Sequence, residues 1–209
     1  MNELLSNIKN GWYIINNNKT FRLQFIITLI ALAILLYFFP KFLSFIETRQ
    51  GVVLNDPLLN MFSPVDVTWL TFLVIYLSII TAIIYFIQDA KLLLTAISTY
   101  GIMIIFRIMA MYILPLDPPA QMIALQDPFV EFFGQSSTLT RDLFFSGHTS
   151  IMFLFFLIAK NRYLKYLFLS GTVAIVTLVL IQHVHYSVDV FVAFFVSYCS
   201  YIIAKNIVK

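Results

Sequence analysis

Six stretches of about twenty mainly apolar residues follow one another along the chain, separated by shorter polar segments. A helix of that length crosses a hydrocarbon core about 30 Å thick. Lipid forces the backbone to satisfy its own hydrogen bonds, and no stretch shows the period-two alternation of a barrel strand, so we expect helices. The pattern predicts an all-α membrane protein, a bundle of six transmembrane helices at residues 23–45, 67–87, 92–114, 143–159, 163–181 and 187–207.

The composition supports lipid as the main solvent of the side chains. Hydrophobic residues make up 61% of the 209 residues, charged residues make up 11%, and the mean hydropathy is +0.91. These values lie outside the range of soluble globular domains. Because the chain has no soluble basic domain, we expect membrane lipids as its partners and no nucleic acid.

The polar segments divide the chain into two regions. Residues 1–21 place apolar Leu4 and Ile8 at helical spacing beside polar side chains, which predicts an interfacial segment before the first span. Residues 22–209 form the predicted six-helix domain. Its longest connection, at residues 115–142, is polar and acidic, and we expect it to form a lid or wall over a site.

Basic residues are distributed unevenly between the two sides of the predicted bundle. Of the thirteen lysines and arginines, nine fall on the side of both chain ends, three on the opposite side, and Arg107 within a span. Cytoplasmic loops carry an excess of Lys and Arg, so both termini are predicted to be cytoplasmic. The short loops are typical of a bacterial inner membrane protein, in which the opposite, outer side would be periplasmic; in a eukaryote it would be lumenal or exofacial.

All three histidines fall at outer ends of predicted spans, although they are far apart in the sequence. Ser146-Gly147-His148-Thr149 opens the fourth span, and a helix N-terminus presents N–H groups and a positive dipole end that suit an anionic phosphate. We expect Ser146 to cap this helix and Gly147 to let the backbone approach a ligand closely. His148 then falls in the first turn, beside the bound group.

Residues 185–189 read His-Tyr-Ser-Val-Asp at the start of the sixth span. If the helix has begun there, the spacing of four puts the imidazole and the carboxylate on one face. Asp189 can accept a hydrogen bond from one ring nitrogen of His185 and leave the other nitrogen as a nucleophile or base. With His148 as the general acid for the leaving oxygen, these residues suit a metal-free phosphoryl transfer.

The same side chains allow other interpretations. A single interfacial histidine is often amphipathic packing, but a His–Asp pair facing a second histidine is costly in a membrane unless it has a function. His183 and His185 form a His-x-His pair that could join His148 and Asp189 in a metal site. Residues two apart on a helix point to different sides, so we expect no metal and no cofactor. Tyr186 is expected among the interfacial and lipid-packing aromatic residues.

Two arginines are candidates for binding phosphate oxygens. Arg107 lies about two turns inside the third span, where a fixed cation is costly, and its best use is a bidentate clamp on phosphate. Its alternatives are snorkelling and pairing with an acid such as Asp189. Arg141 lies shortly before the Ser-Gly-His segment and is either a phosphate ligand or a solvated loop charge. Asp142 could position Arg141 or cap the fourth helix.

The two histidine segments resemble the motifs of a known family. Residues 146–149 and 185–190 look like those of the sphingomyelin synthase-like branch of the type-2 phosphatidic acid phosphatase superfamily. The superfamily's phosphatases usually have Pro before Ser-Gly-His and Ser-Arg ahead of the second histidine, where this chain has Phe145 and, at residues 178–179, Leu-Val. Within the second motif, only Ser187 departs from the branch, by a conservative change.

The resemblance covers the second to sixth predicted spans, more weakly outside the two motifs. Arg107 with residues 111–115 resembles the arginine-bearing third span of the branch, and residues 56–57 and 64–66 also resemble it. Members acting on ceramide commonly have Cys-Gly-Asp before the fourth span, where residues 140–142 read Thr-Arg-Asp.

The resemblance implies an integral membrane lipid phosphotransferase that works through a phosphohistidine intermediate. His185 would be the nucleophile, Asp189 its orienter, and His148 the acid that releases the first alcohol and then activates the second. The acceptor would be a lipid alcohol, diacylglycerol or ceramide-like. With water as acceptor, the same site would be a phosphatase of phosphatidic acid or a related lipid phosphate. A non-enzymatic anion or lipid transporter is the alternative of another class.

Overall fold

The structure is a computed structural model that describes residues 8, 11–15, 17–127 and 139–208. These residues form helices and loops without a strand, and an isolated parallel bridge joins Val52 to Leu116. The elements in chain order are α2 (Lys19–Glu47), the 3₁₀ helix η1 (Leu59–Met61), α3 (Thr68–Phe86), α4 (Ala90–Ile113), α6 (Gly147–Ile158), α7 (Arg162–Ile181) and α8 (Ser187–Ile207).

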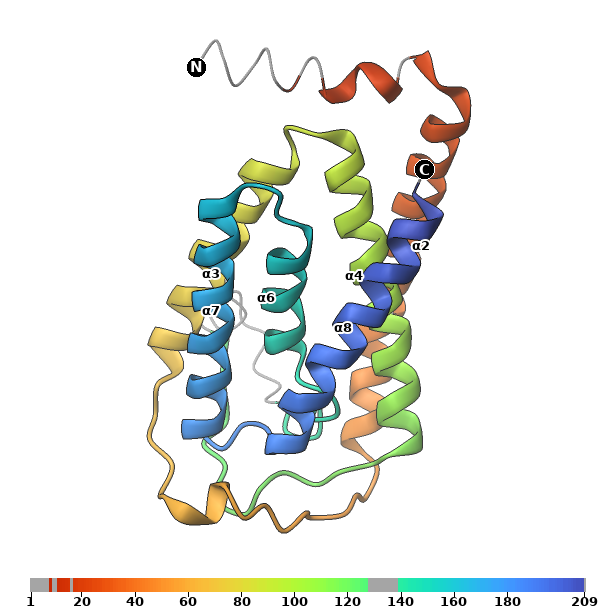
Figure 1. Ribbon diagram of the computed structural model, residues 1–209. Helices are drawn as coiled ribbons and strands as arrows, with labels where there is room; N and C mark the ends of the chain where they lie inside the picture. Colours follow the sequence, from red (N-terminus) through yellow and green to blue (C-terminus); the bar gives the residue numbers. More distant parts are fainter. Residues whose placement is uncertain (1–7, 9–10, 16, 128–138, 209) are drawn as a thin grey trace.

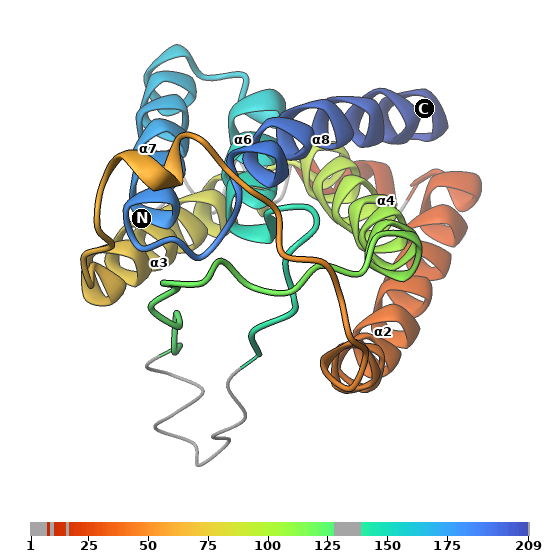
Figure 2. The same ribbon diagram turned by 90° about the horizontal axis from the view of Figure 1, so that it is seen from below.

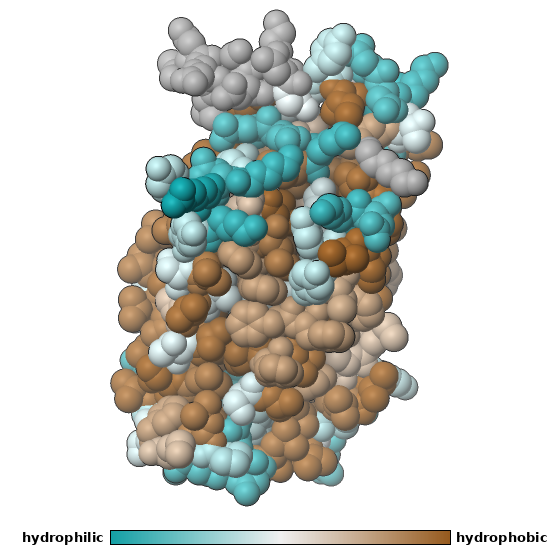
Figure 3. Space-filling model, viewed as in Figure 1, coloured by the Kyte–Doolittle hydropathy of each residue, from teal (hydrophilic) through white to brown (hydrophobic). Residues whose placement is uncertain are grey.

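Among the described residues, five helices are long and apolar enough to cross a membrane, namely α2, α3, α4, α7 and α8. Their apolar side chains form a broad zone on the surface, with polar residues gathered toward the two ends (Figure 3). Trp69 and Phe191 are 78% and 75% exposed on this surface. Such outward apolar side chains suit a lipid solvent, and the long apolar helices fit a multi-pass integral membrane protein.

The predicted count of six spans is not confirmed, because the fourth predicted span forms a shorter helix. α6 has 12 residues, and at about 1.5 Å per residue it reaches about 18 Å, less than the thickness of a hydrocarbon core. The helix begins at Gly147 rather than near Leu143, because Ser146 caps it by accepting a hydrogen bond from the Thr149 N–H. In Figure 1 the lower end of α6 stands well above the lower ends of α7 and α8.

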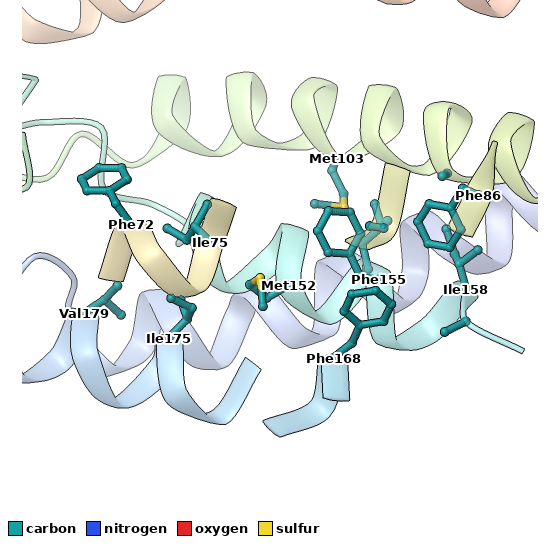
Figure 4. Close-up of a cluster of buried hydrophobic side chains, with 14 of the residues drawn as sticks. Phe72, Ile75, Phe86, Met103, Met152, Phe155, Ile158, Phe168, Ile175 and Val179 are labelled. Atoms are coloured by element: carbon teal, nitrogen blue, oxygen red, sulfur yellow. The ribbon is translucent and has the colours of Figure 1, made fainter. Parts of the chain in front are cut away.

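α6 lies at the centre of the bundle and packs against α3, α4, α7 and α8. Figure 4 shows Met152 and Phe155 of α6 in a cluster with aromatic and aliphatic side chains of α3, α4 and α7. The Phe155 ring meets the rings of Phe86 and Phe168 at centroid distances of 6.0 and 5.5 Å. This cluster fixes the depth at which the N-terminus of α6 lies.

The face of α8 that is buried in the bundle is made mainly of small side chains. After Asp189 and Val190 its buried residues are Ala193, Ser197, Ser200 and Ala204. Small residues let two helices in a membrane approach closely, and the Ser197 hydroxyl lies 3.3 Å from the Ser150 carbonyl of α6. The close approach brings the first turns of α6 and α8 together.

The first and last described residues lie at the same end of the bundle, called here the terminal end. Residues 11–15 are helical, and Trp12 packs in a cluster that also contains Phe21 and Val208. The predicted interfacial segment, residues 1–21, therefore overlaps the start of α2 and lies in part outside the described residues. The opposite end, the site end, carries the α2–α3 loop, the connection after α4 and the α7–α8 turn (Figure 2).

Two loops cross the site end and are joined to each other. The Val52 N–H donates to the Pro115 carbonyl, and the Asp117 N–H donates to the Val52 carbonyl, both at 3.1 Å. The second loop also reaches the α7–α8 turn, where the Ile123 N–H donates to the Gln182 carbonyl at 3.2 Å. The predicted lid at residues 115–142 falls in part on residues 128–138, which lie outside the described residues.

Candidate active site

The α7–α8 turn places His185 just before α8 and Asp189 in its first turn. His185 Nδ1 lies 3.4 Å from Asp189 Oδ2, and the two side chains are 2% and 0% exposed. The same carboxylate oxygen accepts a hydrogen bond from the Tyr186 N–H at 3.0 Å. The structure thus brings the predicted His–Asp pair together and holds the carboxylate where it can orient the imidazole.

The N-terminus of α6 meets this pair. The Ser146 N–H donates a hydrogen bond to the backbone carbonyl of Asp189 at 3.2 Å, which joins the starts of α6 and α8. His148, in the first turn of α6, is half-buried and lies within electrostatic range of His185 and Arg107. The edge of the Phe72 ring supports the imidazole of His148 at a centroid distance of 6.2 Å.

Three buried polar atoms at this place have no hydrogen-bond partner among the described residues. They are His148 Nδ1, His185 Nδ1 and Asp189 Oδ1. A buried polar atom without a hydrogen bond costs about 1–3 kcal/mol of folding free energy, so natural proteins rarely gather several of them. They gather where α6 and α8 begin, and His185 Nδ1 faces Asp189 Oδ2 at 3.4 Å. The other two atoms favour a site that is completed by a bound polar group.

Arg107 of α4 lies against the first residue of α6. A Cβ atom placed on Gly147 would lie 1.9 Å from Arg107 Nη1, so only glycine lets the guanidinium approach the helix N-terminus this closely. Arg107 is buried. The two predicted phosphate-binding features, the arginine and the Ser-Gly-His helix start, are therefore side by side.

The partner of Arg107 is Asp142 rather than Asp189. Arg107 Nη2 and Nε lie 2.7 and 3.2 Å from Asp142 Oδ1, and Nη2 also reaches the Asp142 carbonyl at 3.3 Å. Asp142 neither caps α6, since Ser146 does so, nor pairs with Arg141 among the described contacts. Its charge keeps the buried arginine paired.

Arg141 is directed toward other partners. Its Nε donates to Asp117 Oδ1 at 2.6 Å, and its Nη1 donates to the backbone carbonyl of Glu47 at the end of α2. The Glu47 carboxylate in turn accepts the backbone N–H groups of Thr140 and Arg141, each at 3.1 Å. These contacts tie the segment before α6 to α2, so the structure does not bring the Arg141 guanidinium to the two histidines.

Two residues of the site end were missed or misread in the sequence. Tyr186, expected among lipid-packing aromatics, is 1% exposed; its hydroxyl donates to the Asp117 carbonyl at 2.8 Å and accepts from the Leu54 N–H at 3.2 Å. Asp56 Oδ2 accepts the Ser187 N–H at 2.6 Å, between His185 and Asp189 in the chain. The only sequence signal for Asp56 was the weak family resemblance at residues 56–57.

Hydrogen bonds keep Asp56 ionised. Burial alone would raise the pKa of Asp56, but hydrogen bonds from Ser187, Leu58 and Leu59 outweigh it, so the pKa lies below its ordinary value. Asp56 is thus a buried carboxylate at neutral pH that caps the first N–H group of α8.

His183 lies apart from the other two histidines. It has a φ of 56°, a left-handed conformation that is uncommon for a residue with a side chain, and its ring meets that of Phe62 at 5.1 Å. Burial lowers the pKa of His183, an effect that Asp56 offsets only in part. No group of three or more His, Cys, Asp or Glu side chains is arranged to hold a metal ion within the part of the chain that the structure describes.

The fold and this site together define a class: a helical membrane protein with a cluster of histidine, aspartate and arginine side chains at a helix N-terminus. Residues 141–206, which contain α6, α7 and α8, match a family model described as PAP2 superfamily C-terminal. The match supports membership of that superfamily and an enzyme of the lipid phosphatase or phosphotransferase type. It includes His148, His185 and Asp189 but not Arg107, and it does not confirm the sphingomyelin synthase-like branch. Comparisons with curated proteins and with solved structures gave no significant match.

Proposed function

We propose that the protein is an integral membrane lipid phosphotransferase that moves a phosphate or phospho-head group from a phospholipid to a lipid alcohol through a phosphohistidine. The observation that carries this proposal is the meeting of His148 with the His185–Asp189 pair at the N-terminus of α6, beside Arg107 and Gly147. Phosphoryl transfer depends mainly on such positioning and charge stabilisation.

His148, His185 and Asp189 act in both halves of the proposed reaction. First, His185 Nε2 attacks phosphorus while Asp189 faces Nδ1, the bond from phosphorus to the first alcohol oxygen breaks, and His148 gives that oxygen its proton. Then His148 takes the proton of the acceptor hydroxyl, whose oxygen attacks phosphorus, and the bond from phosphorus to His185 breaks. Both histidines return to their starting protonation states.

The charge of the transferred group would be met by Arg107 and the N-terminus of α6. A helix N-terminus offers backbone N–H groups, and a guanidinium can hold two phosphate oxygens at once. Ser146 and Gly147 contribute through the helix end, the first by capping it and the second by admitting Arg107. Arg141 contributes indirectly, by fixing the segment before α6 to α2.

The surroundings of the site suit a lipid substrate. Longer apolar helices enclose the recessed N-terminus of α6, so the phosphate of a phospholipid could enter sideways while its acyl chains stay in lipid (Figure 1). The acceptor would be diacylglycerol or a ceramide-like alcohol entering by the same route.

Hydrolysis of a lipid phosphate is the second candidate, and the family match favours it because superfamily members include phosphatases. The same three residues serve if water replaces the lipid alcohol.

One assay separates the two candidates. Detergent-purified protein is incubated with fluorescent diacylglycerol or ceramide plus mixed phospholipids, and separately with phosphatidic acid, and both new lipid and released phosphate are measured. New phospho-lipid that depends on His185 supports the transferase, whereas phosphate release alone supports the phosphatase. If neither appears, the enzymatic proposal fails.

Trapping the intermediate tests the covalent step against non-covalent transport. In His148→Ala, the acid–base group is lost, so we expect a phosphohistidine on His185 to form slowly and to discharge more slowly still. Acid-labile phosphate found on the peptide containing residue 185, and absent in His185→Ala, supports the mechanism. Lipid or anion movement without any labelled histidine would favour a transporter.

We further propose that the terminal end faces the cytoplasm and the site end faces the outer side, since most basic residues gather at the terminal end. Cys199 is the only cysteine, so Cys199→Ala gives a clean background. In intact cells, an impermeant maleimide should label Asn60→Cys at the site end but not Asn206→Cys at the terminal end. The reverse pattern would invert the orientation.

A further inference from the structure

A cavity of about 570 Å³ lies at the site end, beside the α7–α8 turn. Its walls are the α2–α3 loop, at residues 53–63, and residues 119–121 of the loop after α4, and His183 and Tyr186 of the turn also line it. The volume is that of a small-molecule site. We call this space the loop cavity.

The polar groups of the loop cavity are hydrogen-bonding or negative. Asn55, Asp56, Asn60, Ser63 and Gln121 line it, and no lysine or arginine is found among the described residues of its lining. Asp56 is ionised, as its hydrogen bonds require. A phosphate would find no positive side chain here, whereas an amine or a hydroxyl group would find acceptors.

His183 is held at the wall of this cavity with an unused ring nitrogen. Its Nε2 is buried without a hydrogen-bond partner among the described residues, and the residue is 3% exposed. The left-handed φ of 56° and the contact with the Phe62 ring set its direction. A buried ring nitrogen without a partner, beside a polar cavity, favours a ligand with a polar group that can hydrogen-bond to it.

The loop cavity is coupled to the candidate active site by two of its own residues. Tyr186 lines the cavity and donates its backbone N–H to Asp189. Asp56 lines the cavity and accepts the Ser187 N–H. When the phosphorus of a lipid lies at His185, its acyl chains extend into the bilayer, so its head group must extend toward the site end, where the cavity opens.

We propose that the loop cavity binds the head group of the donor lipid and selects one that is uncharged or positively charged and carries amine or hydroxyl donors. This proposal rests on the proposed function, because it assigns the part of the substrate beyond the phosphorus. The acceptors are Asp56 and Asn60, and His183 adds a ring nitrogen without a partner. No lysine or arginine stands among the described residues of the lining, which disfavours a second phosphate.

Charge substitutions in the exposed wall test this assignment without disturbing the core. Asn60→Lys adds a positive charge to the cavity and Asn60→Asp adds a negative one, and Gln121→Lys and Gln121→Glu repeat the pair on the opposite wall. Asn206→Lys, exposed at the terminal end, is the matched control. The measured quantity is the ratio of kcat/KM for phosphatidylethanolamine to kcat/KM for phosphatidic acid, which has no head group beyond the phosphate.

We expect the lysine variants to lower this ratio about fivefold and the acidic variants to raise it, since charges several ångströms apart near a protein surface interact by about 1 kcal/mol. Asn206→Lys should leave it unchanged. A ratio that stays within about twofold in all four cavity variants would overturn the proposal while leaving the proposed function intact.

Native mass spectrometry of the purified protein with the two lipids provides a readout without turnover. If wild-type protein turns over neither lipid, the proposed function fails, but a charge-dependent change in the bound ratio of the two lipids would still support the head-group cavity. A bound ratio that is insensitive to residues 60 and 121 would overturn it.

Discussion

α2 buries four of its 29 residues, whereas α6 buries six of its 12. α2 lies at the edge of the bundle and packs mainly against α4, whereas α6 is surrounded by four other helices (Figures 1 and 2). α2 is long enough to cross the bilayer alone, and its interior side chains are apolar. α6 is too short to do so, and its N-terminus carries the polar residues of the candidate site.

The difference shows how this fold places polar chemistry inside a membrane. A helix that must face lipid is constrained by length and hydropathy. A helix enclosed by other helices need not cross the whole hydrocarbon core, so it can end inside the bundle, where neighbouring protein groups surround its terminus. The short α6 therefore begins deeper in the bundle than the loops of the site end. His148, Arg107 and the His185–Asp189 pair meet at this helix N-terminus.

The largest effect is expected from removing the His185–Asp189 pair. His185→Ala removes the proposed nucleophile, and Asp189→Asn puts an amide where the carboxylate faces Nδ1 and accepts the Tyr186 N–H, so each should reduce turnover about 10³-fold or more. The assay is phosphatidic acid and phospholipid turnover, with membrane insertion checked by yield and gel filtration. Asp66→Asn, an exposed carboxylate that accepts the Thr68 N–H, is the matched control and should retain activity. Full activity in His185→Ala would remove the basis of the mechanism.

The next largest effect is expected at the contact between α4 and α6. In Gly147→Ala the new Cβ would lie 1.9 Å from Arg107 Nη1, so the guanidinium must leave the helix N-terminus, and we expect kcat/KM to fall about 100-fold. Gly101→Ala, in α4, is the control, because its Cβ would meet only Leu35 Cδ1 at an ordinary 3.8 Å. Equal activity of the two variants would show that Arg107 need not touch α6.

Contacts between residues close in the sequence could be predicted for this site, whereas contacts between residues far apart in the sequence could not. Ser-Gly-His forms the cap and first turn of α6, which capping rules predict. The pairing of His185 with Asp189 was predicted from helical spacing. α8 begins only at Ser187, so the two side chains meet because the α7–α8 turn places His185 beside the first turn of the helix. The Arg107–Asp142 and Asp56–Ser187 bonds join residues 35 and 131 positions apart. No spacing rule connects such pairs, because their meeting depends on how the helices pack.

The length of α6 was hidden for a related reason. Leu143 and Phe145 are apolar, so a hydropathy profile includes them in the span. Both are buried, but they precede the cap at Ser146 and lie outside the helix. A hydropathy window cannot distinguish an apolar residue in a buried loop from one in a helix. The α2 span, which faces lipid along most of its length, contains no such loop and was predicted within a few residues at each end.

A smaller effect is expected at the cap that joins the α2–α3 loop to α8. Asp56→Asn keeps the shape but turns one acceptor oxygen into a donor, so the Ser187 N–H loses its partner. With phosphatidic acid, which has no head group for the loop cavity, we expect kcat to fall about tenfold and KM to change little. Loss of kcat without loss of KM would indicate a positioning role, whereas equal loss of folded protein and of activity would indicate a purely structural one.

The same carboxylate predicts a pH dependence of stability. Since the folded-state pKa of Asp56 is lowered, its contribution is fully present above the ordinary pKa of about 4 and is lost as the pH falls through the lower folded value. The unfolding temperature of wild-type protein should therefore drop more steeply on acidification below about pH 4 than that of Asp56→Asn. Parallel curves would show that Asp56 contributes little to folding.

The smallest effect is expected on the outer face of α2. Ile34 is 53% exposed to what would be lipid, and lipid chains can fill the space that Ile34→Ala leaves, so the unfolding free energy should change by less than about 0.5 kcal/mol. Leu154→Ala, in α6, removes a side chain that is 1% exposed, and the cavity left among packed helices should cost about 2–4 kcal/mol. Unfolding in mixed micelles measures both. Equal losses of unfolding free energy in the two variants would mean that another protein surface, rather than lipid, covers α2. The sparse burial of α2 within the bundle would then reflect contact with a partner protein.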